Sequence, residues 1–345
     1  MRRHTSLALS AVAPLRLILT ISVLCATPAG TALADQPAWE QWQHVPGIVD
    51  LAARSDGRLV GMASGRFFTL TRDGQSSPFA TASDGYTGAT PDAESYFVVV
   101  PALTVDAAGC SFNADDVFVL DLTTPPGVAR VDPQGHASRF ATLSSVDTLG
   151  GIASDTTGLF GHRLLVTGSR NNQTSVFAID CAGGSTTLTN TAPPLEGGIA
   201  VAPATFGQFA GTLIAPDENT GQLWAIDPSG RATVVIVPSL PTGGDTGVES
   251  IGFVPPGFSS GGFAYLADRG TPNNPFPGTD SILRLSAAAL TSAGVQDGDL
   301  LVSTEGNGTT VAIRCAATCT VISAATGTNG GHIEGHVVVV ADQPT

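Results

Sequence analysis

An all-β fold of six repeated units is the architecture that this sequence predicts, and three observations lead to it. Residues 196–230 contain three short apolar segments, 196–203, 211–218 and 221–230, and residues 232–237 supply a fourth. The third segment ends in Asp-Pro-Ser-Gly, a turn sequence with Pro at its second position. The same pattern recurs at similar intervals, and Ile152 to Ile199 spans the same number of residues as Asp180 to Asp227. A repeat of ~40–50 residues with four short strands is typical of a β-propeller blade.

Composition and repetition argue against the other fold classes. Apolar residues make up 42% of the chain and charged residues 13%, a balance that suits a large buried core and not a disordered chain. A β-sandwich is the alternative all-β fold, but sandwiches lack internal repeats of this kind. Seven blades is the nearest alternative within propellers, because the junction between the fifth and sixth units is long enough to contain further strands.

The first four units each supply a complete set of strand segments. The first begins at residue 47 and continues through 58–64, 66–74 and 76–82. The second begins at residue 94 and continues through 115–121, 127–135 and 137–143; the third begins at residue 150 and continues through 162–168, 175–184 and 186–190. The fourth is the unit of residues 196–237 described above.

The last two units are less regular. The fifth is expected to begin at residue 249 and to continue through 262–270 and 280–286. The sixth contains 298–306, 309–315 and 319–325 but has no obvious first strand. Residues 334–340 resemble the start of the fourth unit, so we expect this C-terminal strand to help close the ring, because an open ring would leave sheet edges unpaired.

The first 34 residues have the features of a secretory signal peptide. Arg2, Arg3 and Arg16 form a basic start, Leu17–Ala26 is an apolar stretch, and Ala32-Leu33-Ala34 is a small-x-small cleavage site. The apolar stretch is too short for a membrane span. We therefore expect cleavage after Ala34 and a secreted or extracytoplasmic protein whose single propeller domain comprises residues 35–345.

Charge and cysteine content fit this expectation. The formal net charge is −14, and all 15 basic residues are Arg, which argues against nucleic acid or an anionic membrane as partner. A monomer that binds a small molecule or a protein at the channel face is expected.

Four cysteines follow the signal peptide, and an even number in an exported chain predicts disulfides. Cys315 and Cys319 would clamp a tight hairpin, which leaves Cys110 to pair with Cys181.

Acidic residues recur where the mouth of the propeller channel is expected. In a propeller, the start of each innermost strand and the loop after each second strand lie on one face, around the channel. The first group of polar residues stands at strand starts: Glu94, Glu196, Glu249 and Glu334. The second group lies at the end of the second strand of a unit or just after it: Asp217, Glu218, Asn219, Asp268, Glu305 and Asn307. Such oxygen ligands suit Ca²⁺. The alternative is a solvated rim, with Arg269 as a counter-charge.

The segments VFAID, LWAID, YLADRG and IAPDENTG resemble NHL-type six-bladed propellers and, more distantly, the gluconolactonase, regucalcin and strictosidine synthase-like superfamily. The resemblance covers nearly all of residues 45–341. Gluconolactonase-like enzymes begin an inner strand with Glu before Gly and use that Glu to hold a catalytic divalent cation. Glu196-Gly197 and Glu334-Gly335 look like this feature. The Asn-Gly-Leu-Ala strand starts of those enzymes are replaced here by Gly-Gly-Ile-Ala.

A second metal hypothesis rests on the segment His332-Ile333-Glu334-Gly335-His336. In an extended strand, side chains alternate, so His332, Glu334 and His336 would share one face and could bind a transition metal. Glycines before the segment and four valines after it oppose a helix.

Two functions remain open from the sequence. No G-x-S-x-G elbow, Walker loop or dinucleotide fingerprint is present. The first expectation is therefore a secreted binding or scaffold propeller. The second is a Ca²⁺-dependent hydrolase of lactones or esters, in which a cation held by Glu196 and Glu334 polarises a carbonyl and activates water.

Overall fold

The structure is a computed structural model that describes residues 36–342. The predicted signal peptide lies outside the described residues. Among the described helices, none has the length and apolar character needed to cross a membrane.

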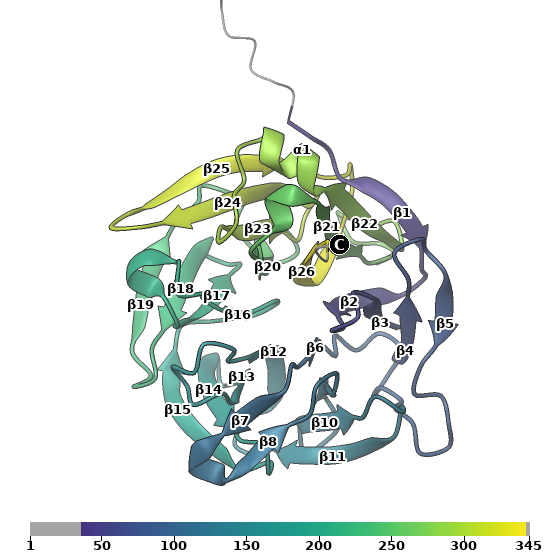
Figure 1. Ribbon diagram of the computed structural model, residues 1–345, viewed down its shortest axis with the longest axis vertical. Coiled ribbons are helices and arrows are strands. Elements are labelled where there is room, and N and C mark those ends of the chain that lie inside the picture. The colour runs from purple at the N-terminus through teal and green to yellow at the C-terminus, as the bar shows by residue number, and fades with distance from the viewer. Residues whose placement is uncertain (1–35, 343–345) are drawn as a thin grey trace, which may run out of the picture. The chain divides into compact units, whose positions relative to one another are not determined.

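Six four-stranded antiparallel sheets surround a central channel, which confirms the predicted six-bladed propeller (Figure 1). Blades 1 to 4 each use four strands in chain order from the channel outward. Blade 1 contains β2 (Ile48–Ala53), β3 (Leu59–Ala63), β4 (Arg66–Leu70) and β5 (Ser76–Pro78). Blade 2 contains β6 (Phe97–Val99), β9 (Val117–Asp121), β10 (Gly127–Val131) and β11 (Ala137–Thr142). Blade 3 contains β12 (Thr148–Ser154), β13 (Leu164–Arg170), β14 (Gln173–Ile179) and β15 (Ser185–Ala192). Blade 4 contains β16 (Ala200–Val201), β17 (Leu213–Asp217), β18 (Gln222–Ile226) and β19 (Ala232–Ile236).

Blades 5 and 6 exchange strands, which corrects the predicted composition of the last two units. Blade 5 has the order β20 (Val248–Phe253), β23 (Leu300–Thr304), β24 (Thr310–Cys315) and β25 (Cys319–Ala325). Blade 6 has the order β26 (Ile333–Ala341), β21 (Gly262–Asp268), β22 (Ser281–Ser286) and β1 (Glu40–His44). The segment at residue 249 is therefore the missing first strand of the 298–325 unit. The prediction paired strands that are neighbours in sequence, which is the usual arrangement but not the one found here.

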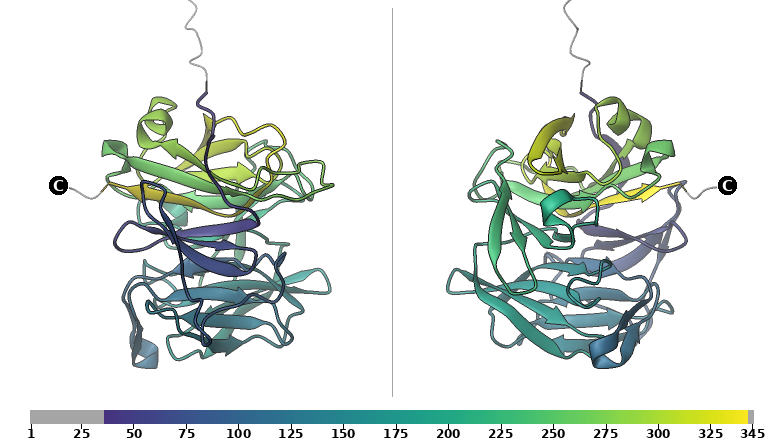
Figure 2. Two further views of the ribbon diagram at one scale, coloured as in Figure 1. Left: turned by 90° about the vertical axis from the view of Figure 1, so that its right-hand side faces the viewer. Right: turned by 60° about the vertical axis from the view of Figure 1, so that its left-hand side comes forward.

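Ring closure uses both ends of the described chain. The C-terminal β26 is the innermost strand of blade 6, as the predicted role in closure requires, and the N-terminal β1 is its outermost strand. The N-terminal and C-terminal strands, purple and yellow in the side views, thus belong to the same four-stranded sheet (Figure 2). Closure in this way leaves no unpaired edge between the first and last blades.

Apolar side chains from adjacent blades form the core. One cluster joins blades 2 and 3 through Phe118, Ile152 and Phe177, and another joins blades 5 and 6 through Leu266, Leu283 and Leu301. Each blade alone would expose these faces to water, so the blades depend on one another for burial.

The remaining elements are short, and both predicted disulfides are present. They are β7 (Leu103–Val105), η1 (Asp106–Ala108), β8 (Cys110–Phe112), η2 (Gly207–Phe209), η3 (Phe258–Ser260) and α1 (Ala287–Ser292). Cys315 and Cys319 close the β24–β25 hairpin, and Cys110 on β8 is bonded to Cys181 after β14. The second bond ties the β7–β8 hairpin of blade 2 to blade 3.

Candidate functional site: a carboxylate pocket at the channel mouth

Seven acidic side chains line a pocket of about 190 Å³ at one mouth of the channel. They come from blades 2, 4, 5 and 6 and from the connections between them: Glu94, Glu196, Glu218, Asp245, Glu249, Glu305 and Glu334. Among the described residues, no side chain of blade 1 or blade 3 lines this carboxylate pocket. The pocket is thus strongly acidic, and blades 1 and 3 contribute no carboxylate to it.

Local backbone features aim the two innermost carboxylates into the pocket. The β20–β23 register shifts between Val248 and Ser250, so Glu249 is an extra residue in a β-bulge. Bulges re-aim a side chain and are common beside functional sites. Glu334 lies near the start of β26, and both carboxylates are 3% exposed.

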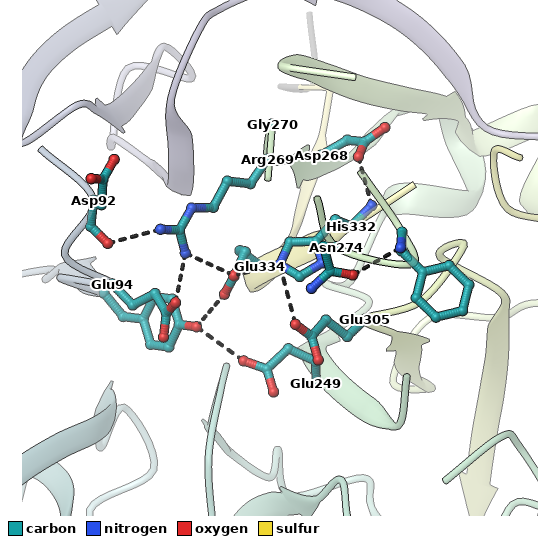
Figure 3. A network of polar contacts seen from close by, with 12 residues as sticks. Asp92, Glu94, Glu249, Asp268, Arg269, Gly270, Asn274, Glu305, His332 and Glu334 are labelled. Carbon is teal, nitrogen blue, oxygen red and sulfur yellow. Dashed lines mark hydrogen bonds and ion pairs between the residues drawn. The ribbon is translucent and has the colours of Figure 1, made fainter. Parts of the chain in front are cut away.

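One arginine, labelled in Figure 3, and one tyrosine connect these carboxylates. Arg269 Nη1 donates to Glu94 Oε1 at 2.6 Å and to Glu334 Oε1 at 3.0 Å. Its Nη2 donates to the backbone oxygen of Asp92 at 2.8 Å. The buried Tyr96 hydroxyl is 3.0 Å from Glu249 Oε1 and also contacts Glu334 Oε2. A single hydroxyl proton serves two carboxylates here, so the network is short of protons or cations.

His332 approaches the same carboxylates from the other side. Its Nε2 is 3.2 Å from Glu305 Oε1 and 3.2 Å from Glu334 Oε1. Its Nδ1 is buried with no hydrogen-bond partner among the described residues. The backbone N–H of His332 donates to Asp268 Oδ1 at 2.8 Å, which fixes the entry to β26.

Burial and mutual repulsion raise the pKa of several carboxyls. Burial, with the charges of Glu334 and Glu218, raises the pKa of Glu305 to about 9. Burial, with the charge of Glu196, raises the pKa of Glu218 to about 7. The pKa values of Glu94, Glu196 and Glu249 are also raised, in each case first by burial and then by neighbouring acids. Full ionisation of this pocket is unfavourable without an added cation.

Glu334 behaves differently because it receives most of the available donors. Burial acts to raise its pKa, but the contacts with His332, Arg269 and Tyr96 outweigh burial and lower the pKa. Glu334 is therefore the ionised centre around which the other carboxyls are arranged.

The structure brings together most of the acids named from the sequence. Glu94, Glu196, Glu249 and Glu334 meet in the carboxylate pocket, and Glu218 and Glu305 lie beside them. Arg269, the expected counter-charge, bonds to Glu94 and Glu334. Asn219 lies at the rim, in a neighbouring pocket next to Glu196.

Asp217 and Asp268, named as rim residues from the sequence, do not line the carboxylate pocket. Both are buried. Asp217 stabilises the turn after β17, because it accepts from Thr220 N at 3.2 Å and from Thr220 Oγ1 at 2.6 Å. Asp268 instead joins segments that are distant in sequence: it accepts from Thr279 N and Oγ1 at the same two distances and from His332 N at 2.8 Å.

His336 also departs from its expected position. The β21–β26 register shifts between Tyr265 and Ala267, and Gly335 has a φ of 66°, so side-chain alternation is broken between Glu334 and His336. His336 Nδ1 is 3.0 Å from Asp50 Oδ2, and Nε2 is 3.0 Å from the Ile152 oxygen across the ring. Burial opposes its charge, but Asp50 raises the pKa of His336 overall. His336 thus crosses the channel between blades 6, 1 and 3 and does not join His332.

Sequence reasoning missed Tyr96 and Asp245. Tyr96 lies two residues after Glu94, but nothing in its local pattern shows that its hydroxyl reaches blades 5 and 6. Asp245 lies in the β19–β20 connection and has a φ of 57°. The Thr-Gly-Gly-Asp sequence there indicates a turn, and a turn alone does not indicate a ligand.

The donor atoms at the centre of the pocket are close enough together for one cation. One donor atom each from Glu305, His332 and Glu334 lies within 4.8 Å of the other two. Two oxygens that bind one Ca²⁺ at ~2.3–2.6 Å are at most about 5 Å apart, so the Glu305 and Glu334 oxygens can bind the same ion, whereas the imidazole nitrogen is a ligand typical of transition metals. The chemistry of the pocket, mostly carboxylate oxygens, fits a hard divalent cation.

No protein-family model matches the chain, and no curated protein matches it in sequence. Solved structures do resemble it. A selenomethionine-substituted virginiamycin B lyase from Staphylococcus aureus shows 13% identity and a TM-score of 0.48, over 83% of this chain and 73% of that one. A streptogramin B lyase shows 12% identity and a TM-score of 0.46, over 87% and 90%. A putative gluconolactonase shows 15% identity and a TM-score of 0.41, over 68% and 72%.

Proposed function

We propose that this protein is an extracytoplasmic binding propeller that holds a divalent cation, Ca²⁺ by its donor chemistry, in the carboxylate pocket. The observation that carries the proposal is that seven carboxylates converge, whereas Arg269 bonds to two of them, Glu94 and Glu334. A bound Ca²⁺ would replace the missing positive charge and let the raised carboxyls ionise. The two disulfides fit an oxidising compartment.

Thermal unfolding in calcium and in chelator tests this proposal. Binding to the folded state alone stabilises it by about 2.7 kcal/mol at a free calcium concentration a hundredfold above Kd. We expect Tm to rise with calcium and to fall with chelator, in protein first shown to be metal-free.

Glu196→Gln is the variant of choice, because the Glu196 side chain has no hydrogen bond to another described residue and its loss leaves no partner unpaired. We expect this variant to blunt the calcium response, whereas Glu40→Gln on the exposed β1 should respond like the parent. A Tm indifferent to calcium and chelator in the parent protein would refute calcium binding.

A Ca²⁺-dependent hydrolase is the second candidate, and His332 is the observation that favours it. A cation in this pocket would polarise a substrate carbonyl and lower the pKa of water. The His332 imidazole, between Glu305 and Glu334, lies where it can take a proton from such a water. Calcium-dependent turnover of ester or lactone substrates that His332→Gln abolishes would support this candidate. Turnover equal to buffer, in protein that binds calcium, would leave the binding function alone.

A further inference from the structure

The outer strands of the six blades fall into two groups that differ in how their free edges are protected. In blades 6 and 2, the outer strands carry a charge, Glu40 in β1 and Arg139 in β11. In blade 1, the outer strand β5 is three residues long and ends in Pro78. Charge, proline and short length are the usual features that keep an edge strand from pairing with another chain.

The outer strands of blades 3, 4 and 5 have none of these features. β15, β19 and β25 contain no charged residue and no proline, and they are eight, five and seven residues long. The chain around β19 and β25 is also uncharged, over residues 232–244 and 315–331. These strands belong to three successive blades of the ring (Figure 1), and we call them the uncharged rim.

Exposed apolar side chains gather on the same part of the molecule. Among the described residues, the large apolar side chains that are exposed are Val234, Val237, Val321 and Leu159. Val234 is in β19, Val237 follows that strand, and Val321 is in β25. Leu159 of blade 3 lies against Gly211 of blade 4. Single exposed valines are ordinary on a protein surface, but all four of these side chains belong to blades 3, 4 and 5.

A hollow of about 410 Å³ lies beside β19. Val234 of β19 forms one part of its wall, and Gln208 of η2 forms another. The backbone N–H of Gln208 donates to the Ala316 oxygen at 3.3 Å, in the turn of the β24–β25 hairpin. The charged residues that line the hollow are Asp227 and Arg231, which have opposite signs. The rim thus offers a recess as well as exposed valines.

Charge decides which occupant fits this surface. The chain has a formal net charge of −14, so two copies repel each other over most of their surface. On the uncharged rim, two copies can approach without bringing like charges together. A strongly charged partner gains little from three uncharged strands, whereas a second copy brings the same valines and the same unpaired backbone groups.

We propose that the uncharged rim is a dimer interface, in which β19 of one copy pairs antiparallel with β19 of a second copy about a two-fold axis. An edge strand presents unpaired N–H and C=O groups, and two identical antiparallel strands satisfy them symmetrically. Val234 is the middle residue of β19, so the axis brings it next to Val234 of the second copy. The same axis places β25 on the side of its own counterpart. This arrangement departs from the monomer expected from the sequence.

The pairing of β19 alone is too small for a stable dimer. Specific interfaces bury about 1,200–2,000 Å² in total, and β19 has only five residues. Val237, Val321 and the hollow therefore supply the remaining contact area, and the dimer is in equilibrium with the monomer. The proposal is independent of cation binding, because the carboxylate pocket lies at the channel mouth and not on the outer strands.

Sedimentation velocity of the disulfide-intact protein over about 1–200 µM tests the proposal, because this range spans the micromolar affinity expected of a small interface. The protein is measured in chelator, where no cation can bridge the carboxylates of two copies, and again in calcium. We expect the mass to rise with concentration from one chain to two, equally in both conditions. The mass of one chain at every concentration would overturn the proposal.

Lysine substitutions locate the interface. Val234→Lys puts two ammonium groups side by side at the axis and should weaken the dimer at least tenfold. Val321→Lys should weaken it to a smaller degree and tests the same surface if the first variant folds poorly. Ser77→Lys on the exposed β5 of blade 1 is the matched control, and its dimer should be as strong as that of the parent.

A mixing experiment tests the two-fold axis. Val234→Glu should also dissociate the dimer, but an equimolar mixture of Val234→Lys and Val234→Glu should form mixed dimers, because opposite charges then meet at the axis. Failure of the mixture to associate would overturn the pairing of β19 with its own copy. Dimerisation that requires calcium, or that survives both Val234→Lys and Val321→Lys, would overturn the uncharged rim as the interface.

Discussion

At the residue scale, Arg269 is the side chain on which the metal-free carboxylate pocket depends. It bonds to Glu94 and to the buried Glu334 and also holds the backbone oxygen of Asp92. Neighbouring acids outweigh the effect of burial and raise the pKa of Arg269, so its charge is permanent. Breaking a buried ion pair from one side leaves an uncompensated charge, which is why the arginine matters more than an exposed pair would.

Arg269→Gln should therefore lower the free energy of unfolding by about 3–5 kcal/mol in chelator, the cost of a broken buried pair. Calcium should restore part of this loss, because the ion supplies the missing charge. Urea unfolding with and without calcium measures both effects. Arg58→Gln, which breaks the exposed Arg58–Asp56 pair, is the control, and its effect should stay within about 1 kcal/mol. Equal losses in the two variants would contradict the assigned role of Arg269.

The raised carboxyl pKa values predict the pH dependence of stability. Burial and neighbouring acids raise the pKa of Glu305 to about 9 and that of Glu218 to about 7 in the folded protein, from an ordinary value of 4.5. The folded state thus holds protons that the unfolded state releases. The contribution of these two carboxyls to the free energy of unfolding is therefore largest below about pH 4.5. It falls as pH rises toward 7 and then 9, by up to about 1.4 kcal/mol per pH unit for each titrating carboxyl.

Glu305→Gln should flatten this fall in chelator, because the neutral amide has no proton to lose. Urea unfolding at several pH values between 5 and 9 gives the slope for the variant and the parent. Glu40→Gln on the exposed β1 should keep the parental slope. A parent protein that becomes more stable in chelator between pH 5 and 9 would contradict the raised pKa values.

At the element scale, β-bulges determine which residues of the inner strands face the pocket. The four inner-strand starts at β2, β12, β20 and β26 all show a register shift in their pairing. Glu249 is the extra residue of the shift in β20, between Val248 and Ser250. Sequence reasoning placed His336 beside Glu334, because strict alternation was assumed where Gly335 breaks it. A strand period is visible in a sequence, but the position of a bulge depends on the partner strand.

The two disulfides connect elements at very different sequence distances, so their removal should have unequal effects. Cys110 and Cys181 are 71 residues apart, and Cys315 and Cys319 are 4 apart. In the chain-entropy account, the longer loop contributes about 4 kcal/mol and the shorter about 2 kcal/mol. The double variants Cys110→Ala/Cys181→Ala and Cys315→Ala/Cys319→Ala, compared by urea unfolding, should follow this order. The reverse order would show that local packing at the hairpin outweighs loop entropy.

At the scale of the whole molecule, the repeat pattern predicted the ring but not the exchange of strands between its last blades. Blades 1 to 4 follow the segments at 47–82, 94–143, 150–190 and 196–237, because each of these sheets forms from consecutive strands. For blades 5 and 6, the chain places β21 and β22 between β20 and β23, and sequence order no longer gives sheet order. The acids at the channel mouth were predictable because each keeps its position relative to the start of its strand, whichever blade that strand joins. Tyr96 was not, since its partners come from two other blades.

The N-terminal segment completes blade 6, so residues in and just before β1 contribute to the stability of the whole ring. Trp39 precedes β1, is 4% exposed, and packs in the core shared by blades 5 and 6. Its Nε1 donates to Thr310 Oγ1 of blade 5 at 2.9 Å, and its backbone N donates to the Thr326 oxygen at 3.2 Å. This residue therefore joins the two blades that also exchange strands.

Trp39→Ala should cost about 3–5 kcal/mol, the range for removing a large buried aromatic side chain, and should leave the Thr310 hydroxyl without its donor. Trp42→Ala is the comparison from the same segment: Trp42 is only partly buried, against Tyr265 and Arg284, at the core that blades 1 and 6 share. Because Trp39 is almost completely buried and also donates to Thr310, the loss at Trp39 should exceed the loss at Trp42 in urea unfolding. A smaller loss at Trp39 would mean that the ring is held closed by β26 alone, with the N-terminal strand only covering its outer edge.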